Sequence, residues 1–502
     1  MDATVVKFGG GSSATPESID KVVEIIAQSR SQGDTPVVVV SAMGVTRGSK
    51  NPKVTDLLLA VSGYVRNGET YSALNTVREI QKRHEEIERH YGILGTTGCL
   101  FTDLEKLVNA NGSIAGSPIT SETAHPARLP WQAVEDLFAS YGERLMATDL
   151  VAILKRKGIR TVLVDTSVNG GFITDSAYGE ASLLPKSLNG EIAASYMRLV
   201  SQQENQGAVP IYTGYIARNE SGQITTLGRD GSNTTALALG AALRAKKIIM
   251  YSDVPGVLAV DDKYVKSPKT ISQLSYAEIL KLAENGVKVF QPNSLNVLRK
   301  RGRLPPIHMR STYDPEGPET IIINVPSKGH TTVKGMGIVD NMFFRQYPVR
   351  SIEQYETILS AAEKYEGITV LRSEFVNDRE EMLARLWFRG DSKAAGDYGD
   401  DKYFIDSLER HISGQAFGGR TPQGRLRLSY GFLVTAVGEG IGNSSKIVAE
   451  FGKVMAETDF PKEVRGLRYR LPVILHRNSI GVVVPWQIAG KVVDDLYHRL
   501  IV

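Results

Sequence analysis

The stretch ATVVKFGGGSSATPESIDKVVEIIAQSRSQGDTPVVVVSA (residues 3–42) decides the fold. It opens with an apolar segment (3–8) and a glycine-rich turn, and then shows a helical pattern over 16–30 that begins at Pro16. A second apolar segment follows at 36–42. A strand, a helix and a strand within about 40 residues predict a βαβ unit with two parallel strands.

The same alternation continues along the chain. A long helical region (54–157) precedes predicted strands at 160–166, 209–217 and 247–254, and an apolar helix over 234–245 joins the last two strands. This order predicts an α/β fold with an open, mostly parallel sheet flanked by helices. Ligands of such sheets bind outside the carboxyl ends of the strands.

The chain changes character near residues 325–335, where it becomes polar and rich in turn-forming residues. We place a domain boundary there, with a first domain over 1–328 and a second over 335–502. The second domain has an α+β pattern of two weakly similar strand–helix–strand units, and the segment 391–401 between them is expected to be a mobile loop.

The composition is that of a globular protein, with 42% apolar and 23% charged residues. The net charge of +4 gives no reason to expect a nucleic-acid or membrane partner. A single cysteine, Cys99, excludes an intramolecular disulfide and fits a reducing compartment. The N-terminal segment does not resemble a signal peptide, and the chain has no apolar run of membrane-spanning length, so we expect a cytoplasmic protein.

The motif VVKFGGGSS (5–13) ends a predicted buried strand with Lys7 and opens into three glycines, Gly9 to Gly11. Glycines let backbone N–H groups approach phosphates closely, and a lysine supplies a point charge for a transferring phosphoryl group. An ordinary glycine turn beside a surface lysine explains this stretch alone about equally well. The pattern GxxxxGK[ST] is absent, so the motif is not a P-loop.

Two other motifs resemble cofactor or metal sites only superficially. VGEGIGN (437–443) has the spacing GxGxG, and too few residues follow it for a Rossmann domain, so we interpret it as a tight strand-to-helix turn. RHEEIERH (83–90) places His84 and His90 six positions apart, which does not put them on one helix face. A solvated charged helix is the favoured interpretation, and no residue is predicted to ligate a metal.

TTLGRDGSN (225–233) carries more polar chemistry than a turn requires: a guanidinium, a carboxylate, hydroxyls and an amide. We interpret it as the lip of a substrate pocket. Three further motifs are unremarkable alone. They are YGERLMA with Glu143, YSDVPGV with Asp253, and ENGVKVFQP with Lys288.

Taken together and in this order, seven motifs between residues 7 and 292 resemble the aspartokinase family of the amino-acid kinase fold. They are KFGG from Lys7, the turn Ser41-Ala42-Met43-Gly44, Thr55 in VTDLLL, the pair Gly142-Glu143, TTLGRDGSN, SDVPGV and GVKVFQP. The tail resembles the paired, ferredoxin-like ACT domains that bind amino-acid effectors in this family. Because paired ACT domains associate with each other, the resemblance also implies a homodimer.

The resemblance implies ATP-dependent phosphorylation of the β-carboxylate of L-aspartate to 4-phospho-L-aspartate, with Mg²⁺. This is a first step toward the aspartate-family amino acids or a specialised product. A carboxylate is already ionised at neutral pH, so the reaction needs no general base. Catalysis then consists of positioning and charge neutralisation, which fits a site of glycines and lysines without a catalytic histidine.

The resemblance also assigns roles to individual residues. Arg229 is expected to clamp the α-carboxylate of the substrate, Glu143 to pair with its ammonium, and Ser41 and Thr55 to fix its reacting carboxylate. The implied catalytic residues are Lys7 and Lys288; the substrate-binding residues are Ser41, Thr55, Glu143, Arg229, Ser232 and Asn233; the nucleotide-binding residues are Lys7, Gly9, Gly10, Ser252, Asp253, Lys263, Lys288 and Val289.

The sequence departs from the family pattern at the lip. Asn233 stands where the family has an acid that helps bind the ammonium, and an acid, Asp230, stands three residues earlier. A hydrogen bond to a charged group contributes roughly 1.5–3 kcal/mol and a neutral one about 1 kcal/mol, so we expect aspartate to bind about tenfold more weakly, or the substrate to differ. The segment LAVDDK (258–263) also departs from the family pattern around Lys263.

Three hypotheses follow. The first is a working aspartokinase, and the second is a kinase of the same fold that acts on another amino acid or carboxylate. The third is a catalytically silent amino-acid sensor whose ACT-like tail carries the function. Retention of Lys7, Glu143, Arg229, Asp253 and Lys288 speaks against the third.

Overall fold

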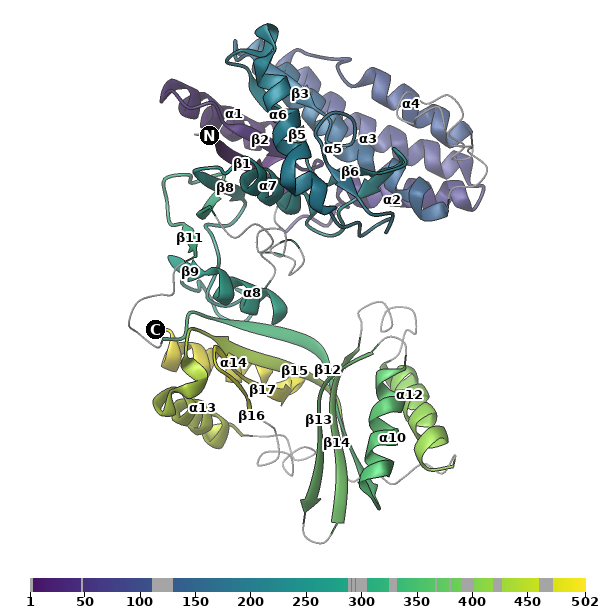
Figure 1. The fold of residues 1–502 in the computed structure, drawn as a ribbon, viewed down its shortest axis with the longest axis vertical. Helices are drawn as coiled ribbons and strands as arrows, with labels where there is room; N and C mark the ends of the chain where they lie inside the picture. Colours follow the sequence, from purple (N-terminus) through teal and green to yellow (C-terminus); the bar gives the residue numbers. More distant parts are fainter. Residues whose placement is uncertain are drawn as a thin grey trace. The chain divides into compact units, whose positions relative to one another are not determined.

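The chain forms two compact units in a computed structural model (Figure 1). The first unit comprises Met1–Val257, Thr270–Tyr276 and Val289–Val325, and the second comprises Leu258–Lys269, Ala277–Lys288 and Pro326–Val502. Two short segments that precede residue 289 therefore group with the second unit, and the domain bounds 1–328 and 335–502 stay a prediction. The structure describes residues 3–46, 48–110, 130–287, 290, 294, 305–324, 332–365, 368–378, 381–390, 401–418, 427–459 and 473–502.

The first unit is built on an eight-stranded sheet, which confirms the predicted open, mostly parallel α/β architecture. Its central strand pairs in parallel with a neighbour on each side, so that Lys7 lies beside Val39 and Met250. The strand order is β3 (Thr161–Val164), β5 (Val209–Thr213), β2 (Val37–Val40), β1 (Thr4–Phe8), β8 (Lys247–Ser252), β10 (Ile307–Ser311), β11 (Thr320–Ile323) and β9 (Gln273–Ser275). Only β11 and β9, at one edge, run opposite to the other six strands.

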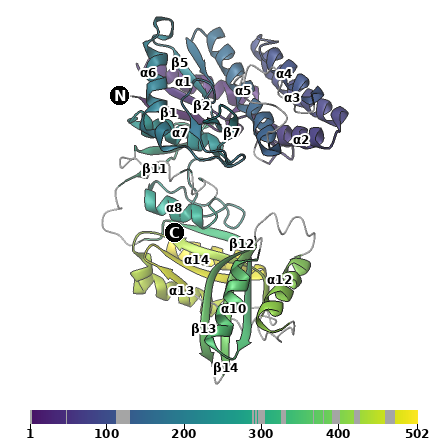
Figure 2. The ribbon, with the colours of Figure 1, turned by 45° about the vertical axis from the view of Figure 1, so that its right-hand side comes forward.

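Helices flank this sheet, and the first one follows the sequence rules closely. α1 (Pro16–Ser31) starts with proline in its first turn, and the side chains of Thr15 and Ser18 cap each other's backbone N–H groups. α5 packs against β3 and β5, while α3 and α4 lie beyond it, away from the sheet (Figures 1 and 2). The other helices of this unit and its short elements are η1 (Gly10–Ser13), α2 (Val54–Arg66), α3 (Thr70–Tyr91), α4 (Gly98–Asn109), α5 (Trp131–Arg156), η3 (Ser187–Glu191), α6 (Ile192–Ser201), η4 (Gln203–Asn205) and α7 (Gly231–Ala242).

The predicted strand over 209–217 is divided in the structure. β5 ends at Thr213 and β6 (Ile216–Asn219) begins three residues later, because Gly214 and Tyr215 turn the chain. Tyr215 has a positive φ of 68°, which no extended strand allows. β6 joins a separate three-stranded sheet with β4 (Ile173–Thr174) and β7 (Ile224–Thr226).

The interpretation of RHEEIERH as a solvated charged helix was wrong for one face of α3. His84 and Glu88 are buried, and Nδ1 of His84 lies 2.6 Å from Oδ2 of Asp149 in α5. Glu88 accepts hydrogen bonds from the backbone N–H groups of Gly95 and Thr97. Across the described ranges, no group of three or more His, Cys, Asp or Glu side chains is arranged to hold a metal ion.

The second unit contains one antiparallel six-stranded sheet to which both predicted strand–helix–strand units contribute. The long strand β12 pairs with β14 on one side and β15 on the other, so it joins the two units. The strand order is β13 (Ile368–Asp378), β14 (Glu381–Gly390), β12 (Gly335–Val349), β15 (Arg427–Val437), β17 (Ser479–Pro485) and β16 (Val473–His476), and the helices are α8 (Tyr276–Glu284), α10 (Ile352–Glu363), α12 (Asp401–Ala416), α13 (Ser445–Glu457) and α14 (Trp486–Leu500). This layout is that of the predicted ACT-like region.

The glycine motif at 437–443 is a strand-to-helix turn, as predicted. β15 ends at Val437, and a short 3-10 turn, η5 (Ile441–Asn443), leads into α13. A Cβ atom on Gly442 would lie only 1.8 Å from the carbonyl oxygen of His476, so the turn needs glycine for packing. The predicted loop at 391–401 lies outside the described residues except for Asp401, which begins α12, a helix that the sequence pattern did not indicate. No helix in the described part of the chain is long and apolar enough to cross a membrane.

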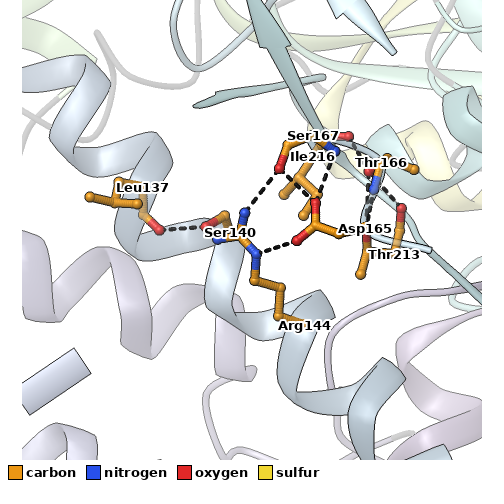
Figure 3. Close-up of polar contacts among 8 residues, drawn as sticks. All are labelled: Leu137, Ser140, Arg144, Asp165, Thr166, Ser167, Thr213 and Ile216. Carbon is orange, nitrogen blue, oxygen red and sulfur yellow. Dashed lines mark hydrogen bonds and ion pairs between the residues drawn. The ribbon is translucent and has the colours of Figure 1, made fainter. Parts of the chain in front are cut away.

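An ion pair between the buried Arg144 and the partly buried Asp165 holds α5 to the carboxyl ends of β3 and β5 (Figure 3). Nε of Arg144 donates to Oδ2 of Asp165 at 2.7 Å, and Nη2 donates to the hydroxyl of Ser167 at 3.0 Å. Thr166, which lies between Asp165 and Ser167, donates its backbone N–H to the hydroxyl of Thr213 at the end of β5. α5 is thereby anchored at the position next to Glu143.

We predict that Arg144→Met lowers the free energy of unfolding by about 1.5–3 kcal/mol, because Asp165, whose side chain is only 20% exposed, would lose its charged hydrogen bond from Arg144. Urea unfolding followed by circular dichroism measures this loss. Arg89→Met is the matched control, since Arg89 is 57% exposed and pairs with Glu85 on the same helix. It should change the same quantity by less than about 1 kcal/mol. Equal losses of unfolding free energy in both variants would show that the Arg144–Asp165 pair stabilises the protein no more than an exposed pair does.

Candidate active site

The predicted site residues of the first unit gather where the sheet topology led us to expect a ligand, at the carboxyl ends of β1, β2 and β8. The turn after β1 is tied to the neighbouring strand by a hydrogen bond from the N–H of Gly9 to the carbonyl of Tyr251, 3.0 Å long. On the other side, the N–H of Gly44 donates to the carbonyl of Gly10 at 2.9 Å. A Cβ atom on Gly44 would lie 2.4 Å from the carbonyl carbon of Gly10, so only glycine permits this approach of the two turns.

Lys7 is the last residue but one of β1, next to this glycine turn. A Cβ atom on Gly9 would lie 3.5 Å from Nζ of Lys7, which places the ammonium close to the turn. Burial lowers the pKa of Lys7 to about 8, while the negative charges of Asp230 and Glu143 act in the opposite direction. Lys7, Glu143 and Asp230, which come from three separate motifs, are therefore neighbours.

Glu143 lies on α5 with only 3% of its surface exposed. Its Oε1 accepts a hydrogen bond from the N–H of Ala42 at 3.0 Å, and its buried Oε2 has no hydrogen-bond partner among the described residues. Burial raises the pKa of Glu143 to about 8, although the Ala42 N–H and the charge of Lys7 oppose the shift. A Cβ atom on Gly142 would lie 2.7 Å from Cβ of Ala42, which explains why glycine precedes this glutamate.

The lip TTLGRDGSN runs from β7 into the N-terminus of α7. Arg229 and Asp230 are exposed, and Asp230 has a positive φ of 60° immediately before the helix. Ser232 is 6% exposed, and its hydroxyl lies near enough to Glu143 to lower the pKa of that carboxyl. Asn233 is partly buried in the first turn of α7. The lip therefore lies close to both Lys7 and Glu143.

The two hydroxyls predicted to hold the reacting carboxylate follow β2. Ser41 comes directly after β2, and Thr55 is the second residue of α2. The N–H of Val54 donates to the carbonyl of Met43 at 3.2 Å, so the start of α2 is tied to the segment that carries Ser41. Lys53, which precedes α2, acts on Lys7 by lowering its pKa, and the sequence interpretation missed it.

The predicted nucleotide contacts are placed unequally. Ser252 ends β8, and a Cβ atom on Gly11 would lie 3.7 Å from Cβ of the exposed Asp253, so this acid borders the glycine turn. Lys263 belongs to the second unit, where its Nζ lies 4.6 Å from the centroid of the Tyr264 ring, and its nucleotide contact stays a prediction. Lys288 and Val289 lie outside the described residues.

Tyr215 is a neighbour of the site that the sequence interpretation missed. A Cβ atom on Gly231 would lie 2.7 Å from the Tyr215 ring, so the ring packs on the start of α7. Burial raises the pKa of Tyr215, and the charge of Glu143 acts in the same direction. A left-handed conformation at a bulky residue is strained and is common beside functional sites. The only sequence signal was the dipeptide Gly214-Tyr215 in the middle of an apparent strand.

Comparison with known proteins identifies the family. A family model described as "Amino acid kinase family" matches residues 2–311. Aspartokinase of Geobacillus stearothermophilus is 28% identical over 289 residues, which cover 57% of this chain and 65% of that protein. Aspartokinase 1, chloroplastic, of Arabidopsis thaliana is 31% identical over 324 residues, covering 63% of this chain and 51% of the relative. The matches thus span about half to two thirds of the length of these curated relatives.

Solved structures agree with this assignment at the level of the fold. Escherichia coli aspartokinase III in complex with aspartate and ADP superposes with a TM-score of 0.68 at 21% identity, covering all of both chains. Clostridium acetobutylicum aspartate kinase superposes with a TM-score of 0.70 at 20% identity, covering 99% of this chain and 100% of the other. The resemblance to aspartokinases that the motifs indicated is therefore confirmed, and the chain belongs to the amino acid kinase family.

Proposed function

We propose that this protein transfers the γ-phosphoryl group of ATP to the β-carboxylate of L-aspartate, forming 4-phospho-L-aspartate and ADP. The observation that carries the proposal is the convergence of Lys7, Glu143 and the Arg229 lip at the carboxyl ends of the central strands of an amino acid kinase. The names of the curated relatives and the aspartate and ADP in the E. coli structure support the same choice of substrates.

The chemistry requires charge neutralisation more than proton transfer. A β-carboxylate oxygen attacks the γ-phosphorus, the bond to the bridging oxygen breaks, and ADP leaves with the electron pair. Since the carboxylate is already ionised, no base must remove a proton. Lys7 would stabilise the charge on the transferring phosphoryl group from beneath the turn formed by Gly9 and Gly10.

The acceptor site distinguishes the two ends of an amino acid. Glu143 presents the buried, unpartnered Oε2 to the substrate ammonium, and the exposed Arg229 is suited to a bidentate contact with the α-carboxylate. Ser232 and Asn233 would complete the ammonium side, while Ser41 and Thr55 would hold the reacting carboxylate.

The phosphates of ATP would lie on the glycine turn, beside Ser252 and Asp253. Mg²⁺ usually retains waters and binds through substrate phosphates with one or two carboxylates, so the exposed Asp253 beside Gly11 is of the right type to hold it. The ion would neutralise phosphate charge during transfer. Lys263, Lys288 and Val289 are proposed to complete the nucleotide site.

The proposal extends to domains, regulation and compartment. A catalytic domain over 1–328 and an ACT-like region over 335–502 would divide catalysis from regulation. A structure of E. coli aspartokinase III contains lysine and aspartate, and the ACT-like layout here supports a site for an amino-acid effector. We further propose a cytoplasmic homodimer joined through the ACT-like regions.

One feature favours a second candidate function, a kinase for a related acid. Compared with the family pattern, the acid of the lip stands at position 230, and position 233 carries the neutral Asn233. The negative charge of Asp230 acts on Lys7 rather than on Glu143. An acceptor with a modified amino group would have less need for a second carboxylate at position 233.

A hydroxamate assay, which traps acyl phosphates, tests both candidates. We expect product with ATP, Mg²⁺ and L-aspartate, and Asn233→Asp should lower KM for aspartate about tenfold by adding a charged partner. Turnover only with L-glutamate or an N-substituted aspartate would establish the second candidate. No turnover with any acid, together with retained amino-acid binding, would identify a silent sensor.

Glu143→Gln should raise KM for aspartate more than tenfold, because the amide has no charge to pair with the ammonium. KM for ATP should change little, and steady-state kinetics with each substrate varied separately measures both values. Glu24→Gln is the control, since Glu24 is exposed on α1 and forms an ion pair with Lys21. An equal rise in both Michaelis constants would contradict the assigned role.

The pH dependence of kcat/KM follows from two pKa values near 8. Glu143 must lose its proton to bind an ammonium, so the rate rises with pH as Glu143 ionises, and Lys7 must keep its proton, so the rate falls as Lys7 is neutralised. We expect a plot of kcat/KM against pH to be a narrow bell-shaped curve centred near pH 8.

Two substitutions should move only the alkaline limb, in opposite directions. Asp230→Asn removes a charge that raises the pKa of Lys7, which shifts this limb to lower pH, and Lys53→Met removes a charge that lowers it, which shifts the limb to higher pH. Since the substrate titrates identically in every experiment, the shifts belong to the enzyme. Shifts of the same sign would refute the assignment of this limb to Lys7.

A further inference from the structure

Asp136 lies outside every motif that the sequence singled out, yet both of its carboxylate oxygens accept hydrogen bonds beside the lip. It is 3% exposed on α5. Both carboxylate oxygens accept from the N–H of Gly179 at 3.0 Å. The backbone N–H of Thr226 donates to Oδ2 at 2.9 Å, and the Thr226 hydroxyl donates to Oδ1 at 2.7 Å.

These contacts join two segments that together hold the lip. Thr226 is the second residue of the lip, and its carbonyl accepts a hydrogen bond from the N–H of Ala181 at 2.8 Å. A Cβ atom on Gly228, which has a φ of +72°, would lie 3.4 Å from the carbonyl oxygen of Gly179. Thr226 therefore precedes the turn at Gly228 that leads to Arg229, and Gly179 lies against that turn. Asp136 bonds to both residues.

Asp136 and Glu143 stand seven positions apart on the same helix. Seven residues are about two turns, so the two carboxylates project from one face, roughly 10 Å apart along the axis. Asp136 accepts hydrogen bonds from Thr226 near the start of the lip, and Glu143 lies close to Lys7. A single rigid helix thereby sets the distance between the lip and Glu143.

We propose that Asp136 is a positioning residue for acceptor binding, which holds the lip so that Arg229 stands at the correct distance from Glu143. The inference rests on the proposed function, because it assumes that Arg229 and Glu143 bind opposite ends of one amino acid. Asp136 itself would stay out of contact with the substrate, because both of its carboxylate oxygens already accept hydrogen bonds from Gly179 and Thr226. It acts through Thr226 and Gly179, whose N–H groups would otherwise be free to adopt other positions.

Asp136→Asn tests this role, because an amide nitrogen cannot accept a hydrogen bond and at least one donor loses its partner. We expect Kd and KM for aspartate to rise about tenfold, with KM for ATP unchanged. Calorimetry measures Kd, and hydrogen–deuterium exchange of peptides that cover 222–233 should be faster than in the wild type.

Asp149→Asn is the matched control. Asp149 is a fully buried acid on the same helix that pairs with His84, away from the lip. It should disturb exchange around its own partners and leave Kd for aspartate unchanged. An equal loss of aspartate affinity in both variants would overturn the proposal, as would faster exchange of the lip in Asp136→Asn with unchanged affinity.

Substitutions of Thr226 keep the test decisive if Asp136→Asn fails to fold. Thr226→Val removes the hydroxyl donor and should weaken aspartate binding, whereas Thr226→Ser retains the donor and should restore wild-type affinity. Equal affinities in these two variants would then overturn the role of the contact. Absence of turnover in the wild type with every acid would refute the proposed function alone, since binding and exchange would still report on Asp136.

Discussion

The structure depends on the burial of two opposite charges, Lys7 and Glu143, at the carboxyl ends of the central strands. Burial penalises each charge, and each lowers the penalty of the other. Such a pair is stable only if its surroundings hold it tightly, since an isolated buried charge is destabilising by several kcal/mol. The glycine contacts around Gly10 and Gly44, and the hydrogen bond from Ala42 to Glu143, supply this support.

Helix α5 carries Glu143 and the residues that anchor the helix and the lip. It presents Glu143 to the site, and the adjacent, buried Arg144 anchors it through Asp165. Two turns earlier, Asp136 holds the lip. Most residues of α5 are buried, so a shift of the helix would move both carboxylates together. A site that recognises both ends of a small zwitterion benefits from such a fixed spacing.

The second unit is organised by the pairing of one long strand, β12. Its two strand–helix–strand units form one sheet because β12 pairs with a strand from each. Edge strands β13 and β16 remain at the two sides, each with a single paired neighbour among the described strands.

Local sequence by itself determined the start of α1, the apolar strands of the parallel sheet, and the glycine turns after β1 and β15. Proline, capping side chains, β-branched runs and glycines act over a few residues, so their effects are visible without the fold. The family motifs likewise indicated the gathering of Lys7, Glu143 and the lip. Only the tertiary structure decided that His84 and Glu88 are buried and that Tyr215 interrupts a strand. It also decided that Asp230 acts on Lys7 and that Asp136 holds the lip. Each of these depends on which distant segment removes water from a side chain or supplies its donor, and that partner is chosen by packing of the whole unit.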